Sequence, residues 1–131
     1  MLVNLYKGKI HRATITQADL NYVGSITIDR DLMEAAGILP YERLQVLNLN
    51  TGDRLETYAI VGDPGSGVIC LNGPAARAGQ VGDLVTIIAY TWVEQELAKD
   101  WQPVMVLVNE RNRITRVIRG VEHGLAPEGS P

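Results

Sequence analysis

The sequence predicts a mainly β protein, either a small barrel or a sandwich. Three observations support this fold class: β-branched and apolar residues gather in short runs, glycine-rich turns separate those runs, and the helical patterns are brief. A packed core is feasible, because apolar residues make up 46% of the chain and a chain of this length buries roughly two-thirds of its unfolded surface. We therefore expect residues 1–119 to form one domain.

The N-terminal half contains four runs with the composition of strands. In chain order they are residues 7–16, 25–28, 44–49 and 55–61. The polar residues 17–22 predict a loop between the first two runs. Asp31 and Glu34 resemble a capping box, which predicts a short helix that begins at Asp31 and ends at Gly37. Residues 50–53 (Asn-Thr-Gly-Asp) predict a hairpin turn, because Asn and Gly tolerate positive φ.

The C-terminal half continues this pattern. Further strands are expected at residues 68–71, 84–93 and 104–108, with short helical segments at 75–78 and 94–100. The glycine-rich residues 62–67 predict a loop and residues 109–113 a polar turn. Residues 114–119 alternate weakly, which leaves their structure open. Residues 120–131 have the composition of a disordered tail.

Composition and charge argue against several classes of function. The net charge of −3 disfavours nucleic acid as a partner. No apolar run reaches the ~18 residues of a membrane span, and the N-terminus lacks a signal-peptide core. The single cysteine, Cys70, suits a reducing compartment, and its neighbours Ile69 and Leu71 predict that it is buried. We therefore expect a cytoplasmic protein with no nucleic-acid or membrane partner.

Conventional catalytic motifs are missing from the sequence. His11 and His123 are the only histidines and there is no cysteine cluster, so we expect no metal site. Residues 65–67 (Gly-Ser-Gly) lack the Lys-Ser/Thr of a phosphate loop, and no nucleophile elbow supports a Ser-His-Asp triad. Residues 50–52 (Asn-Thr-Gly) come nearest to an aspartic-protease motif but have no carboxylate. These motifs alone would indicate only a mainly β domain.

The peptide bond between Gly24 and Ser25 offers a less conventional chemistry. A serine hydroxyl lies close enough to attack the preceding carbonyl, although a planar, resonance-stabilised amide normally resists this. Gly24 has no Cβ, which leaves its carbonyl accessible, and a turn of this kind can store backbone strain. The bland alternative, an ordinary turn that enters a strand, is far more common for a lone Gly-Ser.

Four stretches around this dipeptide carry a family resemblance. They are residues 8–13 (Gly-Lys-Ile-His-Arg-Ala), 22–25 (Tyr-Val-Gly-Ser), 57–60 (Thr-Tyr-Ala-Ile) and 72–76 (Asn-Gly-Pro-Ala-Ala). Together they resemble the pyruvoyl-dependent aspartate 1-decarboxylases, bacterial lyases that make β-alanine for pantothenate synthesis. The resemblance covers residues 1–108. It implies a six-stranded double-psi β-barrel with short helices, assembled as a homotetramer with active sites between subunits.

The resemblance also implies a covalent cofactor made from the chain itself. Self-cleavage between Gly24 and Ser25 would leave a β chain of residues 1–24 and an α chain of residues 25–131, with a pyruvoyl group in place of Ser25. That group would form a Schiff base with the substrate L-aspartate and accept the electrons released with CO₂. Neither a metal nor pyridoxal phosphate is implied. Maturation is either spontaneous or assisted by an accessory protein.

Roles for individual residues follow from the same resemblance. Tyr58 would return a proton to Cα, and Thr57 would hold the ester oxyanion and later contact the substrate. Lys9 and Arg54 are cations suited to the side-chain carboxylate of aspartate, and Arg54 is favoured because arginine binds carboxylates bidentately. The other candidates contact the substrate (Gly73, Pro74 and Ala75) or support the site (Asn72, Tyr22 and His11).

Two positions depart from the family pattern. Pro74 stands where a small residue such as alanine is expected and removes one backbone N–H. Arg77 stands where the pattern often has histidine. Two other functions remain as hypotheses. One is a non-catalytic, unprocessed barrel that serves as a binding or assembly module. The other, a DNA-binding barrel, is disfavoured by the acidic balance.

Overall fold

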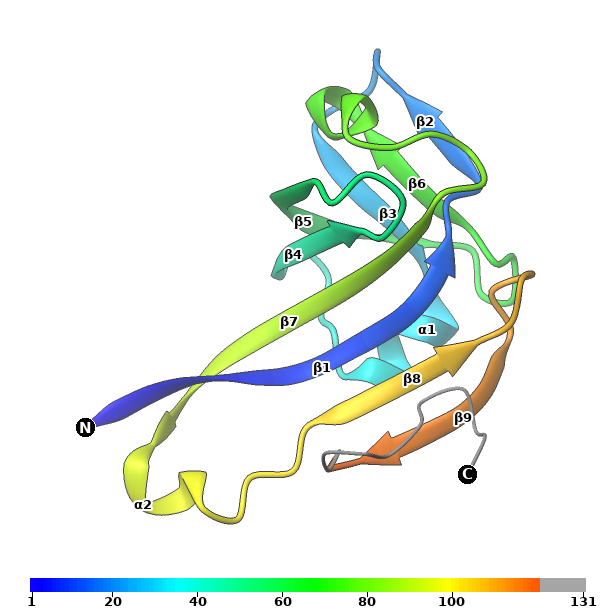
Figure 1. The fold of residues 1–131 in the computed structure, drawn as a ribbon. Coiled ribbons are helices and arrows are strands. Elements are labelled where there is room, and N and C mark those ends of the chain that lie inside the picture. The colour runs from blue at the N-terminus through cyan, green and yellow to red at the C-terminus, as the bar shows by residue number, and fades with distance from the viewer. Residues whose placement is uncertain (121–131) are drawn as a thin grey trace.

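The computed structural model describes residues 1–120, which are mainly β (Figure 1). The strands, helices and one 3₁₀ helix are, in chain order, β1 (Leu2–Thr14), β2 (Gln17–Asp19), β3 (Ser25–Asp29), α1 (Arg30–Ala36), β4 (Arg43–Asn48), β5 (Arg54–Gly62), β6 (Ile69–Asn72), η1 (Gly73–Arg77), β7 (Leu84–Glu94), α2 (Gln95–Ala98), β8 (Val104–Val108) and β9 (Ile114–Arg119). The mainly β class predicted from the sequence is confirmed.

The nine strands form one sheet that curls back on itself. Its order is β2-β6-β3-β5-β4-β7-β1-β8-β9. Only Ile15 and Thr16 separate β1 from β2, and the Thr16 N–H donates to the Ile69 carbonyl of β6 over 2.9 Å. The chain connection and this hydrogen bond therefore hold the end of β1 beside β6, although the two strands lie far apart in the strand order. If β1 and β2 count as one bent strand, six strands close a barrel, and the β8–β9 hairpin extends the sheet from β1 (Figure 1).

Aliphatic side chains fill the barrel, as alternation along β-branched strands requires. The fully buried residues of this hydrophobic core include Ile10, Ile26, Ile28, Leu44, Leu71, Val85 and Ile87. The helix α1 packs against β1, β3, β5 and β8. Its last turn lies so close to β1 that a Cβ on Gly8 would overlap the carbonyl oxygen of Ala36. Glycine at position 8 therefore lets the helix close this side of the barrel.

The carboxylate of Asp29 anchors the end of β3. It accepts hydrogen bonds from the backbone N–H groups of Asp31 (2.8 Å), Gly65 (3.1 Å) and Gly67 (2.8 Å). Asp29, not Asp31, is thus the N-cap of α1, and the predicted capping position was wrong by two residues. The helix ends at Gly37 as predicted, with φ of 72°.

Two strand predictions were wrong, and one segment left open by the sequence proved to be a strand. Residues 17–22 were expected to be a loop, but Gln17–Asp19 forms β2, because its backbone pairs in parallel with β6. The first strand begins at Leu2 instead of residue 7, since β7 extends along it as far as Glu94. Residues 114–119, left open by the sequence, pair with β8 as β9. In each case a neighbouring strand supplies the hydrogen bonds that side-chain patterning does not reveal.

The C-terminal boundary of the described region lies at Gly120. Its N–H donates to the Pro103 carbonyl over 2.8 Å, so residue 120 belongs to the folded part. The tail predicted for residues 120–131 otherwise lies outside the described residues. Within residues 1–120, no helix combines the length and apolar character needed to cross a membrane.

Candidate active site at Gly24 and Ser25

Ser25 lies at the start of β3, directly opposite Asn72 at the end of the antiparallel strand β6. Its side chain is fully buried. The Ser25 hydroxyl donates to the Val23 carbonyl over 3.0 Å and accepts from the Asn72 side-chain amide, with 2.9 Å between Nδ2 and Oγ. Because both hydrogen bonds act on one oxygen, the hydroxyl is held in a defined orientation beside the preceding peptide bond.

The segment after β6 packs tightly against Gly24. Gly73 adopts a φ of 63°, and a Cβ there would lie 2.8 Å from both Cα and N of Gly24 and 2.9 Å from the Tyr22 carbonyl oxygen. The Pro74 ring also packs against Gly24, with its Cδ 3.3 Å from the position that a Cβ on Gly24 would take. Pro74 lies in the first turn of η1, where a helix does not need that residue's N–H. Proline at this position therefore fits the local backbone.

Strand β5 brings the third part of the site. It pairs in parallel with β3, with Ile26 opposite Ala59, so Thr57 and Tyr58 lie beside the Gly24–Ser25 peptide. These elements enclose a cavity of about 340 Å³, lined by Gly24, Ser25, Leu55, Glu56, Thr57, Tyr58, Pro74, Ala75 and Ala78. Six residues named from the sequence meet here, namely Gly24, Ser25, Thr57, Tyr58, Pro74 and Ala75. The volume lies in the range of small-molecule sites.

The cationic candidates lie elsewhere in the same chain. Lys9 is on β1, with its Nζ 4.8 Å from the centroid of the Tyr6 ring, and burial lowers the pKa of its ammonium group. Arg54 is exposed at the start of β5. His11 lines a different cavity, beside Leu107 and Thr115. No cation is therefore among the described residues that line the Gly24–Ser25 cavity.

Tyr22 and Asn72 flank the cavity without lining it. Tyr22 is exposed in the turn before Ser25, and its backbone carbonyl faces Gly73. Asn72 is buried beneath the site and contacts it through Ser25. Both residues are thus adjacent to the predicted cleavage bond.

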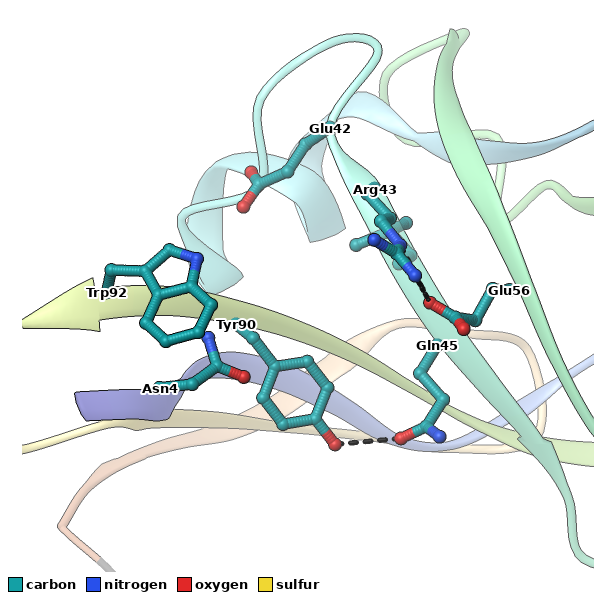
Figure 2. Close-up of a pocket in the computed structure, with 8 residues that line it drawn as sticks. Asn4, Glu42, Arg43, Gln45, Glu56, Tyr90 and Trp92 are labelled. Atoms are coloured by element: carbon teal, nitrogen blue, oxygen red, sulfur yellow. Dashed lines mark hydrogen bonds and ion pairs between the residues drawn. The ribbon is translucent and has the colours of Figure 1, made fainter. Parts of the chain in front are cut away.

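A larger cavity of about 450 Å³ lies next to this one and shares Glu56 with it. Figure 2 shows Arg43 pointing toward Glu56, and the Tyr90 hydroxyl donating to Gln45 Oε1 over 2.8 Å. The other residues that line this larger cavity are Asn4, Glu42, Leu44 and Trp92. None of the residues named from the sequence lines it, so size alone does not identify the site.

Thr27 and Cys70 lie beneath the site and were not recognised as candidates from the sequence. Asn72 Nδ2 donates to Thr27 Oγ1 over 2.9 Å, and the Cys70 thiol donates to Asn72 Oδ1 over 3.1 Å. Cys70 is buried as predicted, but it also has a polar partner. The available signal was strand alternation, since Thr27 follows Ser25 by two residues and Cys70 precedes Asn72 by two.

The described residues hold no group of three or more His, Cys, Asp or Glu side chains that could bind a metal ion. The chemistry of the cavity is that of a buried hydroxyl, a phenol and a threonine around one peptide bond. Such a set can support attack by Ser25 on the Gly24 carbonyl and proton donation from Tyr58.

A family model and curated relatives both match this chain along most of its length. A family model described as "Aspartate decarboxylase" matches residues 1–115. An aspartate 1-decarboxylase of Carboxydothermus hydrogenoformans is 57% identical over 95% of this chain and 98% of its own. Relatives of the same name are 57% identical in Lactiplantibacillus plantarum, over 98% of both chains, and 58% identical in Ruminiclostridium cellulolyticum, over 95% of this chain and 97% of theirs.

Among solved structures, a computationally designed protein titled msDPBB_sym2 aligns with 68% of this chain and 99% of its own. Its TM-score is 0.42 and its sequence identity is 15%. The fold assignment therefore depends on the strand pairing described above.

Proposed function

This chain belongs to the aspartate decarboxylase family, and on that premise we propose that it converts L-aspartate to β-alanine and CO₂ by means of a pyruvoyl group made from Ser25. The names of the relatives support the reaction and the substrate. The product would serve pantothenate synthesis. A single cysteine fits a cytoplasmic site for this reaction.

One observation carries this proposal. The Ser25 hydroxyl is buried and held by Asn72 beside the Gly24 peptide, in a cavity that also contains Thr57 and Tyr58. A structural serine in a turn would not require a phenol and a second hydroxyl at the same peptide bond. The arrangement therefore favours an enzyme over a non-catalytic, unprocessed barrel.

The cleavage proceeds without an external oxidant or reductant. Ser25 Oγ bonds to the Gly24 carbonyl carbon, the amide bond breaks, and the hydroxyl proton ends on the new amine of residue 25. Loss of the Cα proton of residue 25 then expels Gly24 as a carboxylic acid and leaves a dehydroalanine. Addition of water and departure of ammonia convert the dehydroalanine into the ketone. The net change is one water consumed and one ammonia released.

The surroundings of Ser25 fit a pyruvoyl group. Asn72 directs an N–H at the side-chain oxygen of this position, and Gly73 leaves room where a Cβ would press on Gly24. A pyruvoyl group supplies a ketone beside an amide carbonyl, which accepts the electrons that a carboxylate releases with CO₂. Thr57 would stabilise the oxyanion during cleavage, and Tyr58 would donate the proton that replaces the lost carboxyl group.

The substrate's second carboxylate needs a cation, which we propose comes from another copy of the chain. The described lining of the cavity contains Glu56 but no lysine or arginine, since Arg54 is exposed at the start of β5 and Lys9 lies over the Tyr6 ring. Val23, 66% exposed, flanks the cleavage bond. Leu20 and Tyr22, just before it in the chain, are also more than half exposed, and several exposed apolar side chains in one segment favour coverage by a second copy. Such coverage would place the active site between subunits, as in the homotetramer that the family resemblance implies, with Arg54 as the preferred carboxylate ligand.

A turnover assay tests the proposed function. The purified chain, incubated with L-aspartate and without added pyridoxal phosphate, should release β-alanine and CO₂, and a chelator should leave the rate unchanged. Dependence of β-alanine formation on an added cofactor would contradict the proposal. A fully cleaved chain that yields no β-alanine from aspartate would contradict it as well.

A further inference from the structure

Four small polar side chains share one face of the β3–β6 strand pair. Ser25 lies opposite Asn72, and Thr27 lies opposite Cys70. Because side chains two residues apart on a strand point to the same face, the two neighbouring pairs form one cluster. Within the cluster, Asn72 contacts each of the other three.

The side-chain amide of Asn72 uses its donors and its acceptor within this cluster. Its Nδ2 lies 2.9 Å from Ser25 Oγ and 2.9 Å from Thr27 Oγ1, which accounts for both of its N–H groups. Its Oδ1 accepts from the Cys70 thiol over 3.1 Å. A side-chain amide can bind in two orientations related by a half-turn, and its partners decide between them.

Cys70 is the partner that distinguishes the two orientations. The hydroxyls of Ser25 and Thr27 can each donate or accept, so they allow either orientation of the amide. A thiol is a donor, though a weak one, and only a poor acceptor of an amide N–H. It therefore favours the orientation in which Oδ1 faces Cys70 and Nδ2 faces Ser25.

The orientation matters for the chemistry at Ser25. An amide N–H directed at Oγ stabilises the negative charge that develops when the hydroxyl loses its proton. A carbonyl oxygen in the same place would instead accept the hydroxyl proton and oppose that charge. In the observed orientation, the Ser25 proton is directed away from Asn72, toward the Val23 carbonyl.

We propose that Cys70 and Thr27 are positioning residues for self-cleavage: Thr27 holds the Asn72 amide in place through Nδ2, and Cys70 sets the orientation in which an N–H is directed at Ser25 Oγ. This inference rests on the proposed function, because it assigns a role in the maturation step. Burial and the negative charge of Asp19 raise the pKa of the Cys70 thiol. The thiol therefore keeps the proton that it donates to Asn72.

Paired substitutions test the role of each residue. Cys70→Ala removes the donor and Cys70→Ser keeps one, while Thr27→Val removes the acceptor with little change in shape and Thr27→Ser keeps it. The measurement is the rate constant for conversion of freshly purified full-length chain into its two fragments, by intact-mass spectrometry. We expect Cys70→Ala and Thr27→Val each to slow cleavage about threefold to tenfold, the size of one hydrogen bond. Thr27→Ser should cleave at nearly the wild-type rate. Cys70→Ser should fall between the wild type and Cys70→Ala, because its hydroxyl can still donate to Asn72 but also allows the other orientation.

An Asn72→Ala background separates positioning from general packing. Without the amide, neither Cys70→Ala nor Thr27→Val should slow cleavage further, because the group that they orient is gone. Equal slowing by Thr27→Ser and Thr27→Val would overturn the proposal. So would wild-type cleavage in Cys70→Ala, or an undiminished effect in the Asn72→Ala background.

A second measurement does not depend on cleavage. In the unprocessed chain, hydrogen exchange of the Asn72 side-chain amide can be followed by NMR. Exchange should be slow in the wild type and in Cys70→Ser, and faster in Cys70→Ala. A wild-type chain that never cleaves would defeat the proposed function, yet the exchange rates would still test the orientation. Equal exchange in all three chains would overturn it.

Discussion

Gly73 lies directly against Gly24, so that a Cβ at position 73 would be 2.8 Å from both Cα and N of Gly24. The two residues are far apart in the sequence and meet because β6 ends beside the start of β3. This contact fixes the backbone on the N-terminal side of the Gly24–Ser25 bond. Ser25 itself is fixed on the other side by Asn72.

Gly73→Ala should therefore slow self-cleavage. The added Cβ would displace Gly24, and a misplacement of about 1 Å at a reacting centre can reduce a rate about 10²-fold. Gly82→Ala is the matched control, because Gly82 also has a positive φ, 97°, but no atom within 4 Å of its Cβ position. The fraction of cleaved chain over time measures both variants. Gly82→Ala should cleave at the wild-type rate, and equal rates in the two variants would contradict the role of the contact between Gly73 and Gly24.

Arg54→Ala should weaken aspartate binding and leave cleavage intact. Loss of a charge-assisted pair in a partly desolvated site costs roughly 2–5 kcal/mol, so KM should rise about thirtyfold or more. Peptide self-cleavage needs no such partner. Arg116→Ala, which removes an exposed arginine from β9, should leave KM unchanged. If KM is also unchanged in Arg54→Ala, the carboxylate is bound by Lys9 or another group.

Tyr58→Phe should separate the two reactions of the chain. The ring keeps its place beside Ser25 in the cavity, while the proton donor is lost. General acid catalysis contributes about 10²–10⁴-fold, so kcat should fall within that range while the fragments still form. Tyr41→Phe, at an exposed position, serves as the control and should turn over normally. Wild-type kcat in Tyr58→Phe would assign the proton to a water or another side chain.

Asp29→Ala should destabilise the fold. Three backbone N–H groups would lose their acceptor, and loss of the helix cap alone costs about 1 kcal/mol. We expect a loss of about 1–3 kcal/mol in the free energy of unfolding. Denaturant titration in a Ser25→Ala background keeps the chain in one piece. Asp63 is exposed in the loop that contains Gly65 and Gly67, and Asp63→Ala should lower the free energy of unfolding much less. Equal losses in the two variants would contradict the anchoring role of Asp29.

Strand patterning in the sequence located most of the barrel. The predicted strands at 44–49, 55–61, 68–71 and 84–93 agree with β4, β5, β6 and β7 to within one residue at each end, because β-branched runs bounded by turn residues are a strong local signal. The strand β2 was missed, since it is only three residues long, two of them are polar, and its side chains are mostly exposed. It becomes a strand because its backbone pairs with the edge of β6, more than fifty residues away in the sequence.

The site was predictable only in part for a similar reason. Family resemblance named Thr57 and Tyr58, and parallel pairing of β3 with β5 brings them to Ser25. Cys70 and Thr27 are small and uncharged, so nothing in the sequence alone marks them as residues of the site. Only the register of β3 against β6 makes them partners of Asn72. Lys9 and Arg54 were expected at the site and do not line it in the single chain.

Intact-mass spectrometry of the purified chain after prolonged incubation tests the central claim, that the chain opens its own backbone at Gly24. We expect two fragments, residues 1–24 and 25–131, and the larger should be lighter by one ammonia than the 25–131 chain that simple hydrolysis of the Gly24–Ser25 bond would give. Ser25→Ala should remain one chain with an unchanged circular dichroism spectrum, whereas Ser66→Ala, which removes the hydroxyl of an exposed loop serine, should cleave. A preparation that decarboxylates aspartate at full rate and contains only the uncut chain would contradict the account.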